Sequence, residues 1–361
     1  MNSIRSTGYS VHFGDKAYQS LNHYMNKEFC SKIFVLVDNN TREHCWPILK
    51  NKMESNDGLK VLEIRAGEKF KNLDTCQNIW EQLSVLGADR KSVIINLGGG
   101  VITDMGGFIA SCFKRGIRFI NIPTTLLSMV DASVGAKTGI DLGVLKNQIG
   151  LFSNPEMVLI DPEYLKTLSD REMRSGLAEI IKYGYTFDKS LWEEIRTFDS
   201  IDLTRIVPLV HKSVEIKNQV VLDDLHESGL RKTLNFGHTA GHAIESYFLE
   251  KDFKSDLTHG EAIAAGMVIE LYYSSKICDL PIHWAEDLKD FVRKFYGKID
   301  INTEDCDSIM DLMVFDKKNV SGVINFVLLE AMENCNIDQK ISSELIREGR
   351  LYGSESTSRR N

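Results

Sequence analysis

Short apolar runs rich in β-branched residues alternate with amphipathic segments in the first part of the chain. Residues 31–37 and 60–64 are predicted strands, residues 73–86 are a predicted helix that stops near Gly87, and residues 92–97 are another strand. Strands joined through a helix run parallel, because the crossover returns the chain to the same end of the sheet. This alternation predicts an N-terminal α/β domain with a parallel sheet.

Ligands of such a sheet bind at the carboxyl ends of its strands. Three segments follow predicted strands: Asp38, residues 66–71 and residues 98–104. The glycines Gly98, Gly99 and Gly100 let backbone amides approach a pyrophosphate at the start of a helix, although a tight turn without a ligand would have the same composition. Thr124 and Thr125 add hydroxyl groups after a further strand. Because the spacing is not G-x-G-x-x-G, we expect a dinucleotide site of another lineage.

Polar and cationic side chains gather at predicted loop positions in the next segment of the chain: Arg115, Asp131, Lys137, Lys146 and Asn147. Lysines beside glycines can reach an anionic ligand while the backbone stays close to it. Each lysine alone could equally be a solvated side chain, but their grouping favours an anion site.

Long amphipathic helices are predicted in the second half of the chain, over residues 170–183, 191–196, 203–221, 237–249, 260–276 and 284–295. Glu179 and Lys182 are three residues apart and share a helix face. An exposed ion pair is one interpretation of that spacing. The apolar neighbours of the pair favour a second interpretation, in which a carboxylate and an ammonium group face a cleft.

Three histidines suggest a site for a divalent metal. His238 and His242 are four residues apart on one face of a predicted helix, and His259 follows after a short excursion. Solvated or core histidines would have the same spacing. Arg231 and Asn235 precede the pair, and this mixture suits a metal that also faces an anionic ligand.

Composition limits the range of functions. The 361 residues, 43% of them hydrophobic, suffice for two cores, which we place at residues 1–161 and 162–353, with a polar tail at 354–361. A net charge of −8 argues against a nucleic-acid partner. The seven scattered cysteines indicate reduced thiols, and no apolar run is long enough for a signal peptide or membrane span. We therefore expect a cytoplasmic protein without a membrane partner.

Most of the chain resembles the 3-dehydroquinate synthase family. The similar motifs occur in the same order: residues 98–104 (GGGVITD), 114–120 (KRGIRFI), 123–127 (PTTLL), 130–139 (VDASVGAKTG), 146–147 (KN), 178–182 (AEIIK), 231–239 (RKTLNFGHT) and 258–262 (THGEA). The resemblance implies a dinucleotide-binding α/β domain followed by a mostly α-helical domain that binds metal and substrate. It also implies NAD, a divalent metal (zinc or cobalt) and a homodimer.

The resemblance assigns roles to individual residues. The implied metal ligands are Glu179, His238 and His259. The implied groups around a phosphorylated small-molecule substrate are Arg115, Asp131, Lys137, Asn147, Lys182, Lys217, Arg231, Asn235, His242 and Lys317 or its neighbour Lys318. The implied NAD-binding positions are Asp38, Glu68, Lys69, Lys71, Gly99, Gly100, Val101, Asp104, Thr124, Thr125, Lys137, Lys146, Tyr164 and Thr167.

The family converts 3-deoxy-D-arabino-heptulosonate 7-phosphate to 3-dehydroquinate and phosphate, in the shikimate pathway to chorismate and the aromatic amino acids. The implied sequence of steps is transient oxidation by NAD, elimination of phosphate, reduction by the same NADH and an intramolecular aldol closure. NAD would therefore act as a catalyst and not as a co-substrate.

Two positions depart from the family pattern. Ala136 stands where glycine is usual, as in related cyclases of the 2-epi-5-epi-valiolone synthase type that act on sedoheptulose 7-phosphate, and Asp141 stands where asparagine is usual. Lys217, Arg231 and Asn235 are retained and favour a carboxylated substrate. Two more classes stay open: a polyol dehydrogenase of the same architecture, which would release NADH, and a non-catalytic regulator that binds NAD and metal.

Overall fold

The computed structural model describes residues 1–143, 145–250, 257–299, 301, 303–314 and 324–354. The chain divides into two compact units. The first consists of Met1–Gly176 with Asp202–Leu222, and the second of Leu177–Ile201 with Asp223–Asn361. The predicted domain limits at residues 161 and 353 stay a prediction.

A seven-stranded sheet forms the centre of the first unit. Its spatial order is β1-β2-β9-β6-β5-β3-β4, and every neighbouring pair except β1 and β2 is parallel. The strands are β1 (Ile4–Arg5), β2 (Ser10–Phe13), β3 (Ile33–Asp38), β4 (Lys60–Ile64), β5 (Val93–Gly98), β6 (Arg118–Pro123) and β9 (Met157–Ile160). The structure therefore confirms the predicted α/β class and the strands at β3, β4, β5 and β6.

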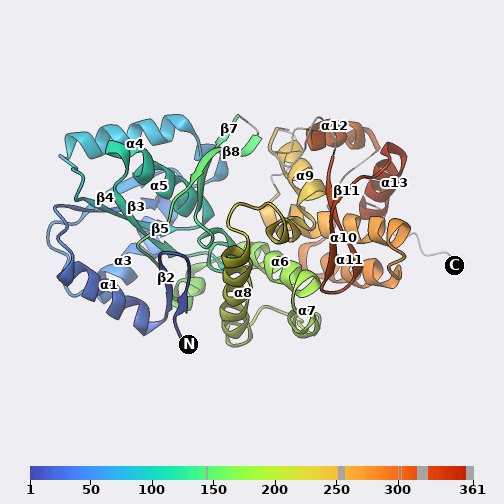
Figure 1. Cartoon of the computed structure of the whole chain (residues 1–361), viewed down its shortest axis with the longest axis horizontal. Coiled ribbons are helices and arrows are strands. Elements are labelled where there is room, and N and C mark those ends of the chain that lie inside the picture. Colours follow the sequence, from blue (N-terminus) through green and yellow to red (C-terminus); the bar gives the residue numbers. More distant parts are fainter. Residues whose placement is uncertain (144, 251–256, 300, 302, 315–323, 355–361) are drawn as a thin grey trace. The chain divides into compact units, whose positions relative to one another are not determined.

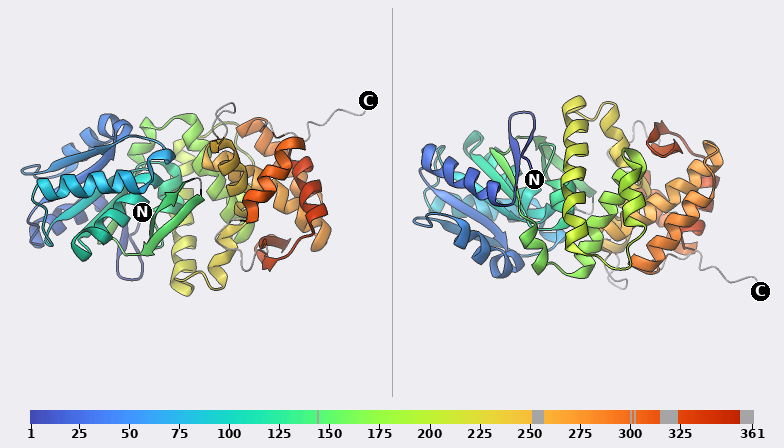
Figure 2. Two further views of the ribbon diagram at one scale, coloured as in Figure 1. Left: turned by 90° about the horizontal axis from the view of Figure 1, so that it is seen from above. Right: turned by 90° about the horizontal axis from the view of Figure 1, so that it is seen from below.

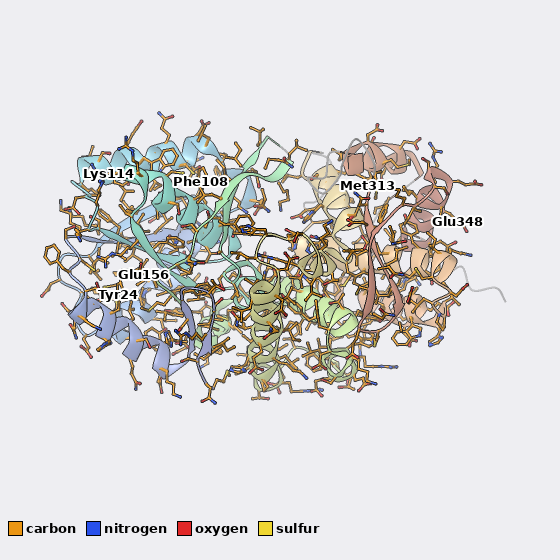
Figure 3. All side chains as sticks on the ribbon, viewed as in Figure 1. Tyr24, Phe108, Lys114, Glu156, Met313 and Glu348 are labelled. Atoms are coloured by element: carbon orange, nitrogen blue, oxygen red, sulfur yellow. The ribbon has the colours of Figure 1, made fainter. Side chains whose placement is uncertain are left out.

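Helices cover both faces of this sheet. Figures 1 and 2 show α4 and α5 on one face and α1 and α3 on the other. Phe108 of α5, labelled in Figure 3, packs in a core with side chains of β3, β4, β5 and α4. The helices are α1 (Asp15–Lys27), α2 (Asn39–His44), α3 (Trp46–Lys52), α4 (Leu73–Val85) and α5 (Gly100–Cys112). Burial of both faces explains why these strands are apolar throughout.

The order of the strands changes direction beside β3. The chain passes from β3 outward to β4 and then returns to β5 on the other side of β3. The carboxyl ends of β3 and β5 are thus neighbours at the point where open α/β sheets bind their ligands. Asp38 ends β3 and Gly98 ends β5, so two of the three predicted ligand segments begin there.

A hairpin replaces the loop that we expected around residues 137–147. Strands β7 (Lys137–Leu142) and β8 (Leu145–Phe152) pair antiparallel, with Gly139 opposite Gly150. A Cβ atom on Gly150 would lie 2.3 Å from the carbonyl oxygen of Thr138, so only a residue without a side chain lets the two strands approach this closely. The polar residues of the segment concealed its strand character from sequence patterns.

The second unit is mostly helical, as predicted. It contains the end of α6 (Asp170–Thr186), then α7 (Lys189–Ile195), α9 (His238–Glu250), α10 (His259–Ile277), α11 (His283–Tyr296), α12 (Thr303–Val314) and α13 (Ser343–Ser354), whereas α8 (Leu203–Asp223) lies almost entirely in the first unit. Strands β10 (Phe326–Ala331) and β11 (Asn334–Gln339) form a hairpin. Met313, labelled in Figure 3, belongs to the core that α9, α10 and β10 share. No helix among the described residues could cross a membrane.

Helices α9 and α10 are in close backbone contact. A Cβ atom on Gly266 of α10 would lie 1.9 Å from the carbonyl oxygen of Gly237, and one on Gly241 would lie 2.7 Å from the Ile263 side chain. Gly237 also has a φ of +77°, which favours glycine. These glycines bring the beginnings of two helices together, and a histidine opens each helix.

Replacement of Gly106 by Ala tests how tightly α5 packs on the sheet. The new Cβ atom would lie 2.0 Å from Oδ1 of Asn96, a buried side chain that donates to Asn121. We expect a loss of about 1–3 kcal/mol of unfolding free energy in urea titrations. Gly100→Ala on the same helix is the control, because its Cβ atom meets Ala132 at an ordinary 3.5 Å. Equal stability of the two variants would contradict the packing argument.

Candidate functional site

The carboxyl ends of β3, β5 and β6 carry the candidate site residues of the first unit. The Asp38 carboxylate caps α2 by accepting the Thr41 backbone N–H at 2.8 Å. The backbone N–H of Thr124 donates to the Gly98 carbonyl at 3.0 Å, which joins the turn after β6 to the glycine turn after β5. Helix α5 begins at Gly100 without a side-chain cap, so its first N–H groups suit an anion. Val101 follows in its first turn.

A buried ionic cluster lies beside this turn. The Lys71 ammonium group is 2.7 Å from Asp104 Oδ2 and donates to Asn147 Oδ1 at 2.6 Å, while Lys146 pairs with Glu68 at 3.0 Å. Burial alone would lower the pKa of Lys71, but the Asp104 and Glu68 carboxylates outweigh it and raise that pKa. Burial raises the pKa of Asp104. The structure therefore brings five of the predicted site residues into one network.

Asp141 supports this cluster. Its Oδ1 accepts the backbone N–H of Asn147 at 2.7 Å, and its own backbone N–H donates to the Lys71 carbonyl at 2.9 Å. Asn147 has a φ of +52°, an uncommon conformation that this hydrogen bond helps to hold. Burial raises the pKa of Asp141 to about 6, with Lys71 opposing and Glu68 adding to the effect. Sequence analysis noted Asp141 only as a departure from the family pattern.

The other predicted residues of the first unit differ in their surroundings. Lys217 of α8 is buried and pairs with Asp131, which lies on a π-helical turn, at 2.8 Å. Lys69 is exposed, with its ammonium group 5.4 Å from the centre of the Phe70 ring. Two side chains follow β9: Tyr164 is buried with its hydroxyl 3.1 Å from that of Tyr18, and Thr167 donates to the Tyr164 carbonyl. The half-buried Lys137 opens β7, and the Thr125 side chain lies 2.9 Å from where a Cβ atom on Gly99 would be.

Arg115 is not brought to these groups within the first unit. It is exposed and precedes β6, whereas Thr124 follows the same strand. Strand β6 therefore separates Arg115 from the carboxyl edge of the sheet. Its implied role in the site stays a prediction.

The second unit places a carboxylate among three histidines. Oε1 of Glu179, on α6, lies 3.4 Å from Nε2 of His238 and 3.1 Å from Nε2 of His259. His238, His242 and His259 offer ligand nitrogens that all lie within 4.8 Å of one another. Two atoms held about 2.1 Å from a tetrahedral zinc ion are about 3.4 Å apart. The distances from Glu179 to His238 and His259 are close to this value.

Hydrogen bonds orient two of the imidazoles. Nδ1 of His238 lies 3.1 Å from the Phe236 carbonyl oxygen, which requires the proton on Nδ1 and leaves Nε2 for a ligand. Burial would lower the pKa of His259, but the carboxylates of Glu245 and Glu179 raise it to about 9. Burial likewise opposes charge on Glu179, but Lys182 and His238 hold its pKa well below the usual range. The opposite charges of these groups therefore stabilise one another.

Three more predicted residues of the second unit are buried or half-buried, and they lie close to Glu179 or His238 in the sequence. Lys182 is buried and pairs with Glu179 on the same helix. Arg231 is buried and donates to the Leu225 carbonyl at 2.7 Å. Asn235 donates from Nδ2 to Glu227 at 2.7 Å. Lys317 and Lys318 lie outside the described residues.

Glu270 is a functional candidate that sequence analysis missed. It is fully buried on α10, and its carboxylate accepts the backbone N–H groups of Gly237 at 2.8 Å and Ala240 at 3.4 Å. It thereby caps α9 from another helix, at the end that carries His238. A glutamate within an apolar helix was its one signal in the sequence.

Comparison with known proteins identifies first the fold and then the family. A 2-deoxy-scyllo-inosose synthase solved with carbaglucose-6-phosphate, NAD+ and Co2+ superposes with a TM-score of 0.83 at 23% identity, covering 98% of this chain and 100% of the other. A 2-epi-5-epi-valiolone synthase from Streptomyces hygroscopicus with NAD+ and Zn2+ bound has a TM-score of 0.84 at 22% identity, with 98% of each chain covered. The protein thus has the fold of these cofactor-binding synthases.

Family models narrow the assignment. Residues 61–175 match the N-terminal model of 3-dehydroquinate synthase, and residues 176–319 match the C-terminal model. The 3-dehydroquinate synthase of Parabacteroides distasonis is 41% identical over 327 residues, which cover 90% of this chain and 92% of that protein. The chain belongs to the 3-dehydroquinate synthase family of enzymes.

Substitution Asp141→Asn should make folding more stable at neutral pH. The native pKa of about 6 exceeds the ordinary 3.8, so the ionised carboxylate destabilises the native state above pH 6, and this cost disappears as the pH falls towards 4. Asparagine keeps the acceptor for Asn147 without the charge. We expect a gain of about 1–3 kcal/mol at pH 7.5 and none at pH 4 in urea titrations.

Asp89→Asn is the control for this test. Asp89 is exposed, and its pKa is lowered, chiefly by the hydrogen bond from Ser31. Loss of that carboxylate should therefore reduce stability at neutral pH. A gain of the same size in both variants would show that the effect comes from net charge and not from the burial of Asp141.

Proposed function

We propose that this protein converts 3-deoxy-D-arabino-heptulosonate 7-phosphate to 3-dehydroquinate and phosphate. The observation that carries the proposal is the approach of Glu179 to His238 and His259 within 3.4 Å, with the buried Lys182 paired to the same carboxylate. Such a site can hold a dication next to an anionic substrate. Membership of the family, with a relative of that name 41% identical, supplies the substrate class.

The chemistry requires a redox cofactor and a Lewis acid. When bound, NAD would supply an acceptor for a hydride from the carbon that bears a substrate hydroxyl and a donor for its return, and a divalent metal would lower the pKa of that hydroxyl. We assign the metal to Glu179, His238 and His259, with His242 beside them. We assign NAD to the carboxyl edge of β3, β5 and β6, where the uncapped N–H groups of α5 suit its pyrophosphate.

The protein's own side chains hold and orient the anionic groups of the substrate. Arg231 suits a carboxylate, because its guanidinium group can donate two parallel hydrogen bonds. Lys182 suits phosphate oxygens. Both are buried in the described structure, so water competes little with an anion for them. Asn235, Lys217, Asp131, Lys137 and Asn147 are the further groups that we assign to the substrate.

Elimination needs little from the protein beyond this positioning. Once the substrate hydroxyl has become a ketone, the C–H group next to that ketone is acidic. An oxygen of the departing phosphate accepts this proton as the bond between carbon and the phosphate oxygen breaks. The cationic side chains stabilise the phosphate that leaves. Reduction of the ketone, ring opening and aldol closure then complete the carbocycle.

The comparisons favour this substrate over those of related cyclases and dehydrogenases. The 2-epi-5-epi-valiolone synthase has 22% identity with this chain, against 41% for the 3-dehydroquinate synthase, so it shares the fold alone. A polyol dehydrogenase does not need the buried cations Lys182 and Arg231. We further propose a homodimer, and a cytoplasmic location, which the free thiols of the six described cysteines support.

Steady-state turnover tests the proposed reaction. With the carboxylated heptulosonate phosphate as substrate, inorganic phosphate should accumulate while absorbance at the NADH band shows no net rise, because each hydride is returned. NAD should be needed only in catalytic amount. Faster phosphate release from sedoheptulose 7-phosphate would favour the other cyclase class, and stoichiometric NADH would indicate a dehydrogenase.

Removal of one imidazole tests the metal ligands. The His259→Ala variant should lose most of its bound zinc or cobalt, measured by elemental analysis after dialysis, and with it the activity. His283→Ala is the control, since His283 also opens a helix of the second unit but is exposed. Unchanged metal content in His259→Ala would contradict the assignment.

A further inference from the structure

Glu245 has none of the predicted roles, but its carboxylate contacts one of the proposed metal ligands. Glu245 lies on α9 and is 7% exposed. Its Oε2 is 3.1 Å from Nδ1 of His259, whereas Nε2 of the same ring is 3.1 Å from Glu179. The imidazole of His259 is therefore held between two carboxylates, one at each nitrogen.

We propose that Glu245 is a positioning residue that fixes the tautomer and the orientation of His259 for metal binding. Its carboxylate accepts a hydrogen bond from the Nδ1–H group, so that Nε2 is the nitrogen that would give up its proton and bind a metal beside Glu179. Because a carboxylate at one nitrogen increases the electron density of the other, it also strengthens the metal bond. This inference rests on the metal site of the proposed function.

The spacing along α9 explains how one helix supplies this arrangement. His238, His242 and Glu245 are separated by four and then three residues, so they lie on the same face over two turns. His259 is the first residue of α10, and close packing through Gly237, Gly241 and Gly266 brings that residue to the same face. The helix that bears two imidazoles thus also carries the acceptor for the third.

His238 and His259 differ in the charge of the group that accepts a hydrogen bond from their Nδ1 atoms. Nδ1 of His238 faces the neutral carbonyl of Phe236, a backbone group that is fixed by the turn before α9. Nδ1 of His259 faces a side-chain carboxylate. Substitution can therefore change the support of His259 alone, which separates the effect of Glu245 from the rest of the site.

Metal affinity measures this support without reference to catalysis. Zinc dissociation constants of the full-length protein can be obtained by competition with a chromophoric chelator at pH 7.5. We expect Glu245→Ala to bind zinc about 10- to 100-fold more weakly than wild type. Glu245→Gln keeps an acceptor oxygen without the charge, so its loss should be smaller. In the cobalt-loaded protein, the visible ligand-field bands of Glu245→Ala should also shift, because the ring of His259 is free to rotate.

Tyr247→Phe is the matched control. Tyr247 lies two residues further along α9, and its hydroxyl donates a buried hydrogen bond to Asp305 at 2.5 Å. This variant should lose stability in urea titrations but retain the zinc affinity and cobalt spectrum of wild type. Equal weakening in Tyr247→Phe would show that Glu245 acts only through helix stability.

Two outcomes overturn the proposal. One is wild-type zinc affinity and an unshifted cobalt spectrum in both Glu245 variants, with Glu245→Gln deciding the matter if Glu245→Ala does not fold. The other is the equal weakening in the control. Failure of the wild-type protein to bind zinc or cobalt would instead refute the metal part of the proposed function, and the role of Glu245 with it.

Discussion

The burial of the Glu179 carboxylate is the constraint on which the second unit depends. A carboxylate removed from water costs several kcal/mol unless positive charge and hydrogen-bond donors surround it. Glu179 is fully buried and meets this requirement through Lys182 on its own helix and two imidazoles from α9 and α10. The packing of α6, α9 and α10 therefore brings together the groups that balance the negative charge of Glu179.

The first unit repeats this solution with the signs exchanged. Lys71 is a buried cation, and two carboxylates balance it: Asp104 on α5 directly, and Glu68 of the preceding turn at 3.9 Å. Asp141 then holds the backbone of Asn147, a second partner of the same ammonium group. Each unit thus keeps charged groups preorganised away from solvent, where electrostatic interactions are stronger than in water.

Supporting residues extend both clusters. Glu270 caps the helix that begins at His238, and Glu245 contacts the ring of His259 on the side away from Glu179. Neither belongs to the groups that we assign to the substrate. Both are buried, and each holds in place a group next to the proposed metal ligands.

Much of the fold followed from sequence patterns, because apolar periodicity reports which faces are buried. Strands β3, β4 and β5 and helices α6 to α11 lie within a few residues of their predicted limits, since both rest on local spacing. The hairpin of β7 and β8 escaped prediction. Its pairing depends on Gly139 facing Gly150 across the two strands, and the apolar periodicity within each strand does not report such a contact.

For the candidate site, too, some features followed from the sequence and others only from the tertiary structure. The sequence by itself determined the residue types and the local spacings: the glycine turn after β5, the pair Glu179 and Lys182 on one helix turn, and the histidines of α9. Only the tertiary structure decided that Glu245 faces His259 and that Glu270 caps α9. Spacing along a chain fixes neighbours within a helix or strand, whereas contacts between elements depend on how whole surfaces pack.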